Sequence, residues 1–320
     1  IRRRIRDPRL VFEIHKIGNV SKTDVCIAYI DGVADDKVLK KIQDNLKNVD
    51  INALTVGDQS LVDTMIKKNV FTPFPKVRYT ERPDVTAAHL VEGKFAIIVD
   101  NSPNVIILPT TVFDFTQDIN DYYFPLFTGN YLRIVRNLTM LATIFLIPIF
   151  LLYINGNITL PSFFDFLTPE ADYTVPMFWQ FFILEFAIDA LKLASLNTPS
   201  PLGTSLSVIG GLIIGEYTIN TGWFTDQSIL YISVVALAGF SQPSIEMTYA
   251  CKFMRVLLLI LCQIFGIWGL LGGIILMIII MAGTKTIVGE PYFYPLVPFN
   301  WKKLKTLLFR TKTSKKVQES

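Results

Sequence analysis

The stretch IVRNLTMLATIFLIPIFLLYI, residues 134–154, decides the broad class of this protein. Arg136 is its one charged residue, and the sequence stays free of charge from there to residue 164. About 20 consecutive apolar residues are enough for a helix to cross the hydrocarbon core of a bilayer. The stretch therefore predicts a membrane-spanning helix.

Charged residues are distributed unevenly around this stretch. The 320-residue chain is 51% hydrophobic and 18% charged, yet residues 134–282 hold only 12 of its 57 charged side chains. The flanking segments have the charge density of an ordinary soluble protein. We therefore expect an N-terminally incomplete cytoplasmic α/β domain over residues 1–130, a polytopic α-helical membrane domain over residues 131–284, and a basic cytoplasmic C-terminal tail over residues 285–320.

Further apolar stretches follow the first one, at residues 177–196, 203–222, 227–245 and 256–284. The loop between the first two stretches carries acidic residues and no lysine or arginine, whereas Arg133 and Arg136 stand at the start of the first. Because cytoplasmic loops are enriched in basic residues, this asymmetry orients the chain. It predicts Ser162 outside the membrane, and Asn197 and Lys303 inside.

The last apolar stretch, residues 256–284, allows two arrangements. It could be one long tilted helix or a hairpin centred on Gly266–Gly273. A single span would place the basic tail outside, against the charge rule, whereas a hairpin keeps the tail inside. Each arm of a hairpin would have only about 14 residues, which is short for a span. The sequence favours the hairpin and leaves the single span open.

Charged residues inside the apolar stretches are the candidate ion pathway. Glu185, Asp189 and Lys192 are spaced by four and then three residues, so they share one helical face, and Glu216 interrupts the next stretch. Charges in a bilayer are costly and usually face water or a partner. Lys192 can neutralise only one of the two carboxylates, so the other must be protonated, pair with another helix, or meet water and cations in a pore. The alternative is a salt-bridge set that holds helices together.

Small residues in the apolar stretches are candidates for helix packing or gating. They are Gly211 and Gly215, which form a small-xxx-small pattern, and the ladder Gly266, Gly269, Gly272 and Gly273. Such residues let helices approach closely in lipid. The pattern favours a homo-oligomer, while packing of helices within one subunit remains the alternative.

The N-terminal third alternates strand and helix patterns, which predicts α/β packing. The expected strands are 24–30, 51–56, 94–100 and 105–109, and the expected helices are 35–48, one that starts near Asp58, and 83–93. The last two strands flank Asn101–Asn104 as a hairpin loop. Both are apolar at successive positions, so we expect the hairpin to be buried on both faces.

The sequence contains no pattern that indicates catalysis or a cofactor. Its two histidines, His15 and His89, lie far apart, and neither HExxH nor GxGxxG occurs. The three cysteines have no CxxC spacing, so neither a metal site nor a disulfide framework is expected. The excess of basic residues follows an apolar run, which favours contact with membrane lipid over nucleic acid.

Several stretches resemble the A subunits of the spore germination receptor family. They include IRRRIRDPRL from residue 1, TERPD at residues 80–84 with the hairpin that follows, TPSPL from residue 198, and PYFYPLVPFNWKKLK from residue 291. The resemblance covers the chain from Ile1 to about Arg310. RYTERPDVTAAHLVEG and TPSPL are most similar to the stage V sporulation branch of the family.

The resemblance implies a multi-pass protein of the spore inner membrane with its N-terminal domain on the cytoplasmic side. It also implies a homo-oligomeric ion channel that releases small ions during germination, together with a transporter-like B subunit and a lipoprotein C subunit. Two other functions stay open: a transporter-like or ligand-sensing receptor subunit, and a non-conducting membrane scaffold.

Overall fold

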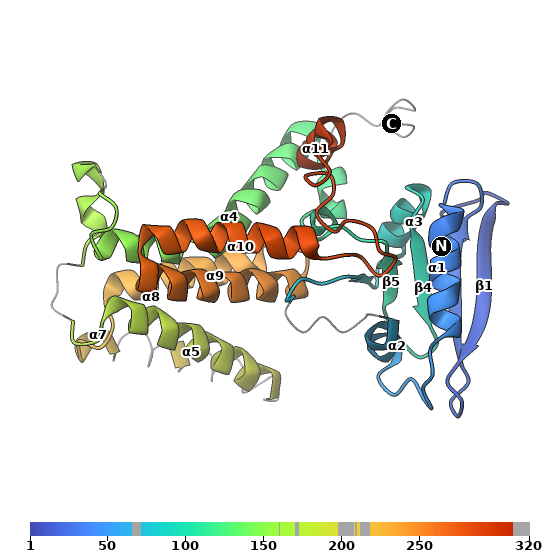
Figure 1. The fold of residues 1–320 in the computed structure, drawn as a ribbon, viewed down its shortest axis with the longest axis horizontal. Helices are drawn as coiled ribbons and strands as arrows, with labels where there is room; N and C mark the ends of the chain where they lie inside the picture. Colours follow the sequence, from blue (N-terminus) through green and yellow to red (C-terminus); the bar gives the residue numbers. More distant parts are fainter. Residues whose placement is uncertain are drawn as a thin grey trace. The chain divides into compact units, whose positions relative to one another are not determined.

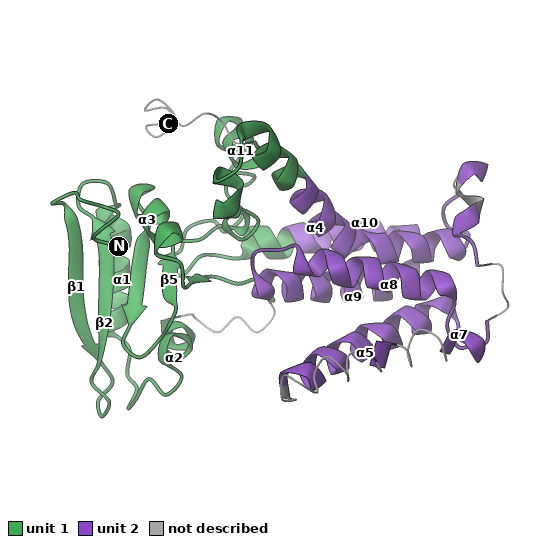
Figure 2. Cartoon of the chain, turned by 180° about the vertical axis from the view of Figure 1, so that it is seen from behind, with its two compact units in different colours: residues 1–134, 279–320 green, residues 135–278 purple. Residues whose placement is uncertain are grey.

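The computed structural model describes residues 1–65, 72–159, 161–169, 173–197, 208, 210–211 and 218–309. The chain divides into two compact units. Unit 1 is Ile1–Ile134 together with Ile279–Ser320, and unit 2 is Val135–Ile278 (Figure 2). The C-terminal region that the charge pattern sets apart as a tail is thus grouped with the N-terminal domain.

Unit 1 contains a five-stranded antiparallel sheet with the strand order β1-β2-β4-β5-β3 (Figure 1). Its strands are β1 (Leu10–Ile17), β2 (Thr23–Ile30), β3 (Arg78–Thr80), β4 (Phe95–Val99) and β5 (Val105–Leu108). The central pair is the predicted hairpin, with Phe95 opposite Leu108 and Ile98 opposite Val105. Most of its residues are buried, which confirms that both faces of the hairpin are covered.

Helices cover both faces of this sheet. Alternate residues of β4 belong to two cores, because successive strand residues point to opposite faces. Phe95 and Ile97 pack in one core with α1 (Asp36–Lys47) and α2 (Gly57–Met65). Ala96 packs in the other with α3 (Pro83–Val91).

The sequence patterns predict the apolar strands and the helices of unit 1 better than the two edge strands of its sheet. The helices expected from residue 35, Asp58 and residue 83 are confirmed. The expected strand at 51–56 is wrong: the segment is irregular, and the carbonyls of Ile51 and Asn52 accept hydrogen bonds from the loop at Asn19–Ser21. The edge strands β1 and β3 are not predicted, because each lacks a continuous apolar run.

The chain after α10 packs into unit 1. Tyr292 is fully buried, and its ring lies 6.2 Å from that of Phe74 and 6.4 Å from that of Phe115. The carbonyl of Tyr292 accepts a hydrogen bond from the backbone N–H of Val112, at 3.1 Å. Val288 joins the core beneath α1. A short helix, α11 (Trp301–Leu308), follows.

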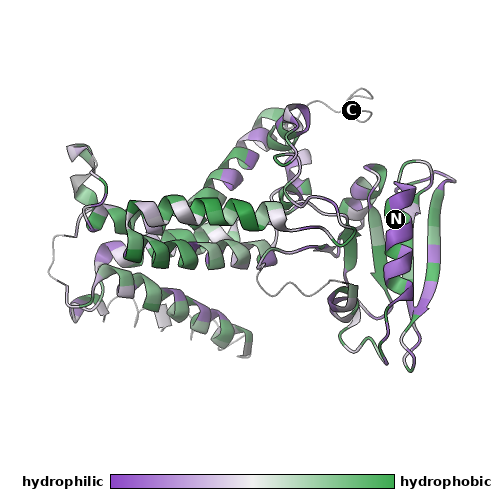
Figure 3. Cartoon of the chain, viewed as in Figure 1, coloured by the Kyte–Doolittle hydropathy of each residue, from purple (hydrophilic) through white to green (hydrophobic). Residues whose placement is uncertain are grey.

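Unit 2 is helical. Its elements are α4 (Leu126–Ile154, which begins in unit 1), the 3₁₀ helix η3 (Ser162–Leu167), α5 (Met177–Asn197), α7 (Thr218–Asn220), α8 (Asp226–Phe240), α9 (Ile245–Phe265) and α10 (Ile267–Gly283). Among the described residues, α4 and α9 are long and apolar enough to cross a membrane, and α8 and α10 are shorter apolar helices (Figure 3).

The predicted stretches at 227–245 and 256–284 are divided differently in the structure. Helix α8 ends at Phe240, and Ser244 begins α9 as its N-cap, because its hydroxyl accepts a hydrogen bond from the Met247 N–H at 3.2 Å. The next reversal is at Gly266, whose φ of 56° favours glycine. The hairpin is therefore confirmed and the single long helix is wrong. Its arms have 21 and 17 residues, because α9 begins before residue 256.

Hydrogen bonds between helices define two ends of unit 2. At one end, the Thr139 hydroxyl of α4 lies 2.8 Å from the Ser241 hydroxyl in the α8–α9 turn. At the other end, Asn155 after α4 donates to Gln263 near the end of α9, at 3.4 Å. The α8–α9 turn thus lies beside Thr139 of α4 at one end of unit 2, and the Gly266 turn lies beside the residues after α4 at the opposite end.

Candidate functional site

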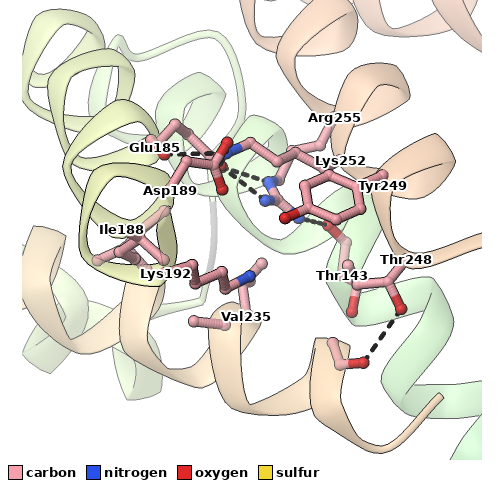
Figure 4. A pocket seen from close by; sticks show the side chains of 13 residues that line it. Thr143, Glu185, Ile188, Asp189, Lys192, Val235, Thr248, Tyr249, Lys252 and Arg255 are labelled. Atoms are coloured by element: carbon pink, nitrogen blue, oxygen red, sulfur yellow. Dashed lines mark hydrogen bonds and ion pairs between the residues drawn. The ribbon is translucent and has the colours of Figure 1, made fainter. Parts of the chain in front are cut away.

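The charged face of α5 lines a pocket inside unit 2. Glu185, Asp189 and Lys192 share this face, as their spacing predicts. Thr143 of α4, Val235 of α8 and several residues of α9 complete the lining (Figure 4). The pocket therefore has charged and apolar walls.

Glu185 forms a two-pronged ion pair with Arg255 of α9. The Arg255 Nε donates to Glu185 Oε1 at 2.5 Å, and Nη2 donates to Oε2 at 2.9 Å. The third nitrogen, Nη1, donates to the carbonyl of Thr143 at 2.6 Å. The two side chains are only 5% and 6% exposed. This pair joins α4, α5 and α9, and such geometry is needed to offset the cost of burying two charges.

Asp189 pairs with Lys252, one turn before Arg255 on α9. The Lys252 ammonium also donates to the backbone carbonyl of Glu185 at 2.9 Å, so it bridges two turns of α5. The Asp189 side chain is 29% exposed. Within the described residues its Oδ1 has no hydrogen-bond donor, although it is buried. One acceptor of this site is thus unused.

Among the described residues, Lys192 pairs with no carboxylate. Its ammonium lies 5.3 Å from the centre of the Phe240 ring and 5.7 Å from that of Tyr249, where cation–π attraction stabilises it. The expectation that Lys192 pairs with one acidic residue is wrong, because Lys252 and Arg255 reach both of them first. No negative charge is left over among the described side chains of the pocket.

Comparison with known protein families matches residues 1–320 to the family described as Bacillus/Clostridium GerA spore germination protein. The chain belongs to the GerA family. The match confirms the resemblance to germination receptor A subunits.

Curated relatives in the GerA family cover the whole chain. Stage V sporulation protein AF of Bacillus subtilis (strain 168) is 39% identical over 100% of this chain and 65% of its own length. Spore germination protein KA of the same organism is 31% identical over 97% of this chain and 57% of its own length. The chain thus spans less than two thirds of the length of these two relatives.

A solved structure is also similar to part of the chain. It is the N-terminal domain of the A subunit of the Bacillus megaterium spore germinant receptor GerK3, with 47% sequence identity. The match covers 34% of this chain and 84% of that one, with a TM-score of 0.27.

The segment most characteristic of the GerA resemblance, TERPD, holds the link that leads into α4. The Arg82 guanidinium binds Asp84 at 2.8 Å and donates to Asn120 at 2.9 Å in the 3₁₀ helix η2 (Ile119–Tyr122). The Tyr123 hydroxyl donates to Asp84 at 2.8 Å. The hydrogen bonds from Arg82 hold the pKa of Asp84 well below its usual range. The side chains of this loop therefore position the link that leads into α4.

A second buried carboxylate lies in the 3₁₀ helix η1 (Val112–Phe115). Asp114 pairs with Lys94 and accepts a hydrogen bond from the Thr111 N–H at 2.7 Å. Burial raises the pKa of this carboxyl, but Lys94 and the hydrogen bonds outweigh burial and lower it to about 2. The group is ionised at neutral pH and stabilises unit 1.

The candidate packing glycines fall into three sets. A Cβ on Gly269 would lie 1.9 Å from the Leu261 carbonyl oxygen, and one on Gly273 would lie 2.4 Å from Leu258, so both face α9. A Cβ on Gly211 or Gly272 would have no neighbour within 4 Å among the described residues. Gly266 forms the turn between α9 and α10. Gly215 and the ion-pathway candidate Glu216 lie outside the described residues.

Lys252 and Arg255 are the site residues that the sequence interpretation missed. Both lie between the apolar stretches 227–245 and 256–284, so the pattern of apolar residues does not place them on a spanning helix. Their spacing could have indicated this role. Lys252 and Arg255 are three residues apart, and Glu185 and Asp189 are four apart, so each pair lies on one face of its helix and the two basic residues can pair with the two acidic ones. In the described part of the chain, no group of three or more His, Cys, Asp or Glu side chains could hold a metal.

Proposed function

We propose that this chain is a membrane subunit of a spore germination complex that forms a homo-oligomeric ion channel and releases small ions during germination. It lies in the spore inner membrane with unit 1 on the cytoplasmic side. By analogy with germination receptors, a transporter-like B subunit and a lipoprotein C subunit are candidate partners. Its role is conduction and assembly rather than enzymatic catalysis.

The observation that carries the membrane part of this proposal is the inverted polarity of unit 2. Glu185 and Arg255 are buried, whereas large apolar side chains of the same helices are exposed. Trp268 of α10 is 75% exposed and Leu237 of α8 is 68% exposed. A soluble monomer rarely exposes such a continuous apolar surface, so lipid or another subunit must cover it.

The two ends of unit 2 support the proposed orientation. Ser162 follows α4 and lies toward the end that also holds the Gly266 turn, and α5 leads from the same side toward Asn197. Helices α9 and α10 form a hairpin, so α10 returns to the end of unit 2 at which α9 began. This arrangement agrees with Ser162 outside, and Asn197 and Lys303 inside. Labelling of single cysteines with an impermeant thiol reagent tests it.

The pocket on α5 is the proposed start of the ion path. Arg255 uses both oxygens of Glu185, so that carboxylate has no capacity left for a passing ion. Asp189 keeps one unused oxygen and is partly exposed. The Lys192 ammonium has opposite charge and lines the same pocket. Asp189 would therefore offer a passing cation its Oδ1 as a ligand while Lys252 holds Oδ2, and the unpaired charge of Lys192 would repel cations.

Planar-bilayer currents of the purified protein test this proposal. We expect Asp189→Asn to lower cation conductance or selectivity several-fold, and Lys192→Gln to raise it, with oligomer size unchanged in both. Glu185→Gln should instead lower the yield of folded protein. Asp31→Asn, in a surface turn of unit 1, is the matched control. Unchanged selectivity in both the Asp189 and the Lys192 variants would contradict the ion path, and no current from the parent protein would favour a scaffold.

Oligomerisation is proposed to use the open glycines. Gly269 and Gly273 are occupied by α9 of the same chain, whereas Gly211 and Gly272 have free Cβ positions. We therefore expect Gly272→Leu to reduce the particle mass in detergent, as measured by light scattering. An unchanged mass with this variant would assign the glycine ladder to packing within one subunit.

A ligand-sensing role is the second candidate, and the pocket itself is the observation that favours it. It combines charged groups with the apolar walls that small-molecule sites require. Saturable binding of a small molecule, lost in Lys192→Gln while currents are absent, would support sensing over conduction.

A further inference from the structure

Helix α11 carries an exposed basic and aromatic surface, on which the Lys303 ammonium lies 5.4 Å from the centre of the Tyr294 ring. Lys302, Lys303 and Lys305 are exposed, while Leu304 is buried on the opposite face. Trp301 is 61% exposed and stacks on Phe299, which is 67% exposed, with 6.3 Å between ring centres. The helix therefore presents three positive charges beside two large exposed rings.

Arg133, in the N-terminal part of α4, holds α11 through a hydrogen bond. Its Nη1 donates to the Leu307 carbonyl at 3.1 Å, near the C-terminal end of α11. The side chain is 1% exposed, and its Nε lies 3.6 Å from the Asp121 carboxylate. Arg133 stands just before the charge-free part of α4, one of the two helices able to cross a membrane. Both Figure 1 and Figure 2 show α11 beside the start of α4.

More exposed aromatic side chains surround this start of α4. Tyr123 is 66% exposed and Phe127 is 85% exposed. Aromatic rings of this kind concentrate where the headgroups of a bilayer meet its hydrocarbon core. Lysines beside them can keep their ammonium groups in water among the headgroups.

We infer that α11 and residues 122–127 form a docking surface for anionic lipid headgroups of the membrane in which unit 2 is embedded. The positive charge of the three lysines is complementary to phosphate headgroups, and basic residues next to a spanning helix are attracted to anionic lipid. The exposed rings fit the boundary of a bilayer, whereas nucleic acid would leave Phe127 and Phe299 in water. The inference rests on the membrane embedding proposed above and goes beyond it by naming the lipid class and the residues.

The environment of Trp301 in the full chain tests the inference. A variant with Trp301 as its sole tryptophan carries Trp179→Phe, Trp223→Phe and Trp268→Phe, and is placed in vesicles of phosphatidylcholine alone or mixed with phosphatidylglycerol. Iodide in the aqueous phase quenches exposed tryptophan. We expect quenching to fall about threefold in the anionic vesicles at low salt and to recover at high salt, because salt screens the attraction.

Two variants that remove the same charge distinguish an effect of the α11 surface from an effect of the net charge of the chain. Lys302→Gln, Lys303→Gln and Lys305→Gln together should abolish the difference between the vesicle types. Lys37→Gln, Lys40→Gln and Lys47→Gln remove the same charge from α1 in unit 1 and should keep it. If the tryptophan changes lower the yield, a bimane fluorophore on Trp301→Cys in a chain free of other cysteines gives the same readout.

Three results would overturn the inference: equal quenching in both vesicle types, an equal effect of the α1 variant, or tight binding of an oligonucleotide that the α11 lysines alone support. A separate measurement shows whether the proposed membrane embedding of unit 2 is itself wrong. In that case Trp268, on the exposed face of α10 and as the sole tryptophan in a variant with Trp179→Phe, Trp223→Phe and Trp301→Phe, would not be quenched by brominated lipid tails.

Discussion

The two units differ in which kinds of side chain they bury and which they expose. Helix α1 of unit 1 buries Val38, Ile42 and Leu46 and exposes lysines, as a helix does beside water. Helix α10 of unit 2 buries Gly269 and Gly273 and exposes large apolar side chains. Both helices are regular and packed, so the difference lies in which side chains face outward: charged ones on α1 and apolar ones on α10.

Buried charge follows the same contrast. In unit 1 Asp114 is held by a lysine at the side of an apolar core, where it supports one loop. In unit 2 the Glu185–Arg255 pair lies at the centre and joins three helices. Apolar contacts between helices bring little gain in lipid, so polar pairs and close backbone contact take over their role.

The largest effect is expected from breaking the central ion pair. Arg255→Met leaves the Glu185 carboxylate buried and unpaired, which should lower the free energy of unfolding by about 3–5 kcal/mol. Unfolding with SDS in detergent micelles measures it. Lys192→Met, which removes a cation that faces only aromatic rings, is the control and should cost far less. Equal losses from the two would remove the contrast between structural and pathway charges.

A smaller loss is expected from filling the contact between α9 and α10. Gly269→Ala places a methyl group against the Leu261 carbonyl and should destabilise unit 2 by about 3 kcal/mol, the upper end for overpacking. Gly272→Ala has open space at the same helix and should be tolerated. Equal thermal midpoints of the two variants in detergent would show that the hairpin does not depend on close backbone contact.

Unit 1 should respond to acid through Asp114. Its folded pKa of about 2 lies below the ordinary value of 3.8, so its stabilisation is complete above about pH 4 and is lost as the pH falls toward 2. The shift corresponds to about 2 kcal/mol. Hydrogen exchange of peptides from β4 and β5 between pH 2 and 5 measures it, with exchange rates corrected for pH. Asp114→Asn should flatten the profile; an unchanged profile would assign the acid response to other carboxylates.

The smallest effect is expected at the water-facing side of unit 1. The Asp35 carboxylate caps α1 by accepting a hydrogen bond from the Lys37 N–H at 2.7 Å. Asp35→Ala should cost about 1 kcal/mol, a typical value for an N-cap. Asp31→Ala, in the preceding turn, controls for the loss of charge. Thermal unfolding that is the same in both variants would show that capping contributes little to this helix.

The sequence predicts most of the fold because its apolar patterns are regular. The hairpin of β4 and β5 and the α1 helix follow from residue spacing alone. The edge strand β1 does not, since His15 and Lys16 interrupt its apolar residues and its pairing with β2 depends on contacts distant in sequence. The antiparallel strand order is likewise set by tertiary packing.

The sequence predicts the α5 residues of the site but not their partners on α9. Spacing places Glu185, Asp189 and Lys192 on one face, but a single helix carries no information about which helix it meets. Lys252 and Arg255 supply the counter-charges, and their role follows only from the packing of α9 against α5. The direction of Lys192 toward aromatic rings is also a property of that packing.

The burial of Tyr292 and Val288 in unit 1 has a consequence for the order of synthesis. A ribosome makes the sheet first. Val288 and Tyr292 follow the end of β5 at Leu108 by 180 and 184 positions, with all of unit 2 between them. The sheet must therefore wait with part of its surface uncovered while the helices are made. The core of unit 1 is therefore complete only after α10 has been synthesised. A chain truncated before Tyr292 would expose part of this core to quality-control proteases.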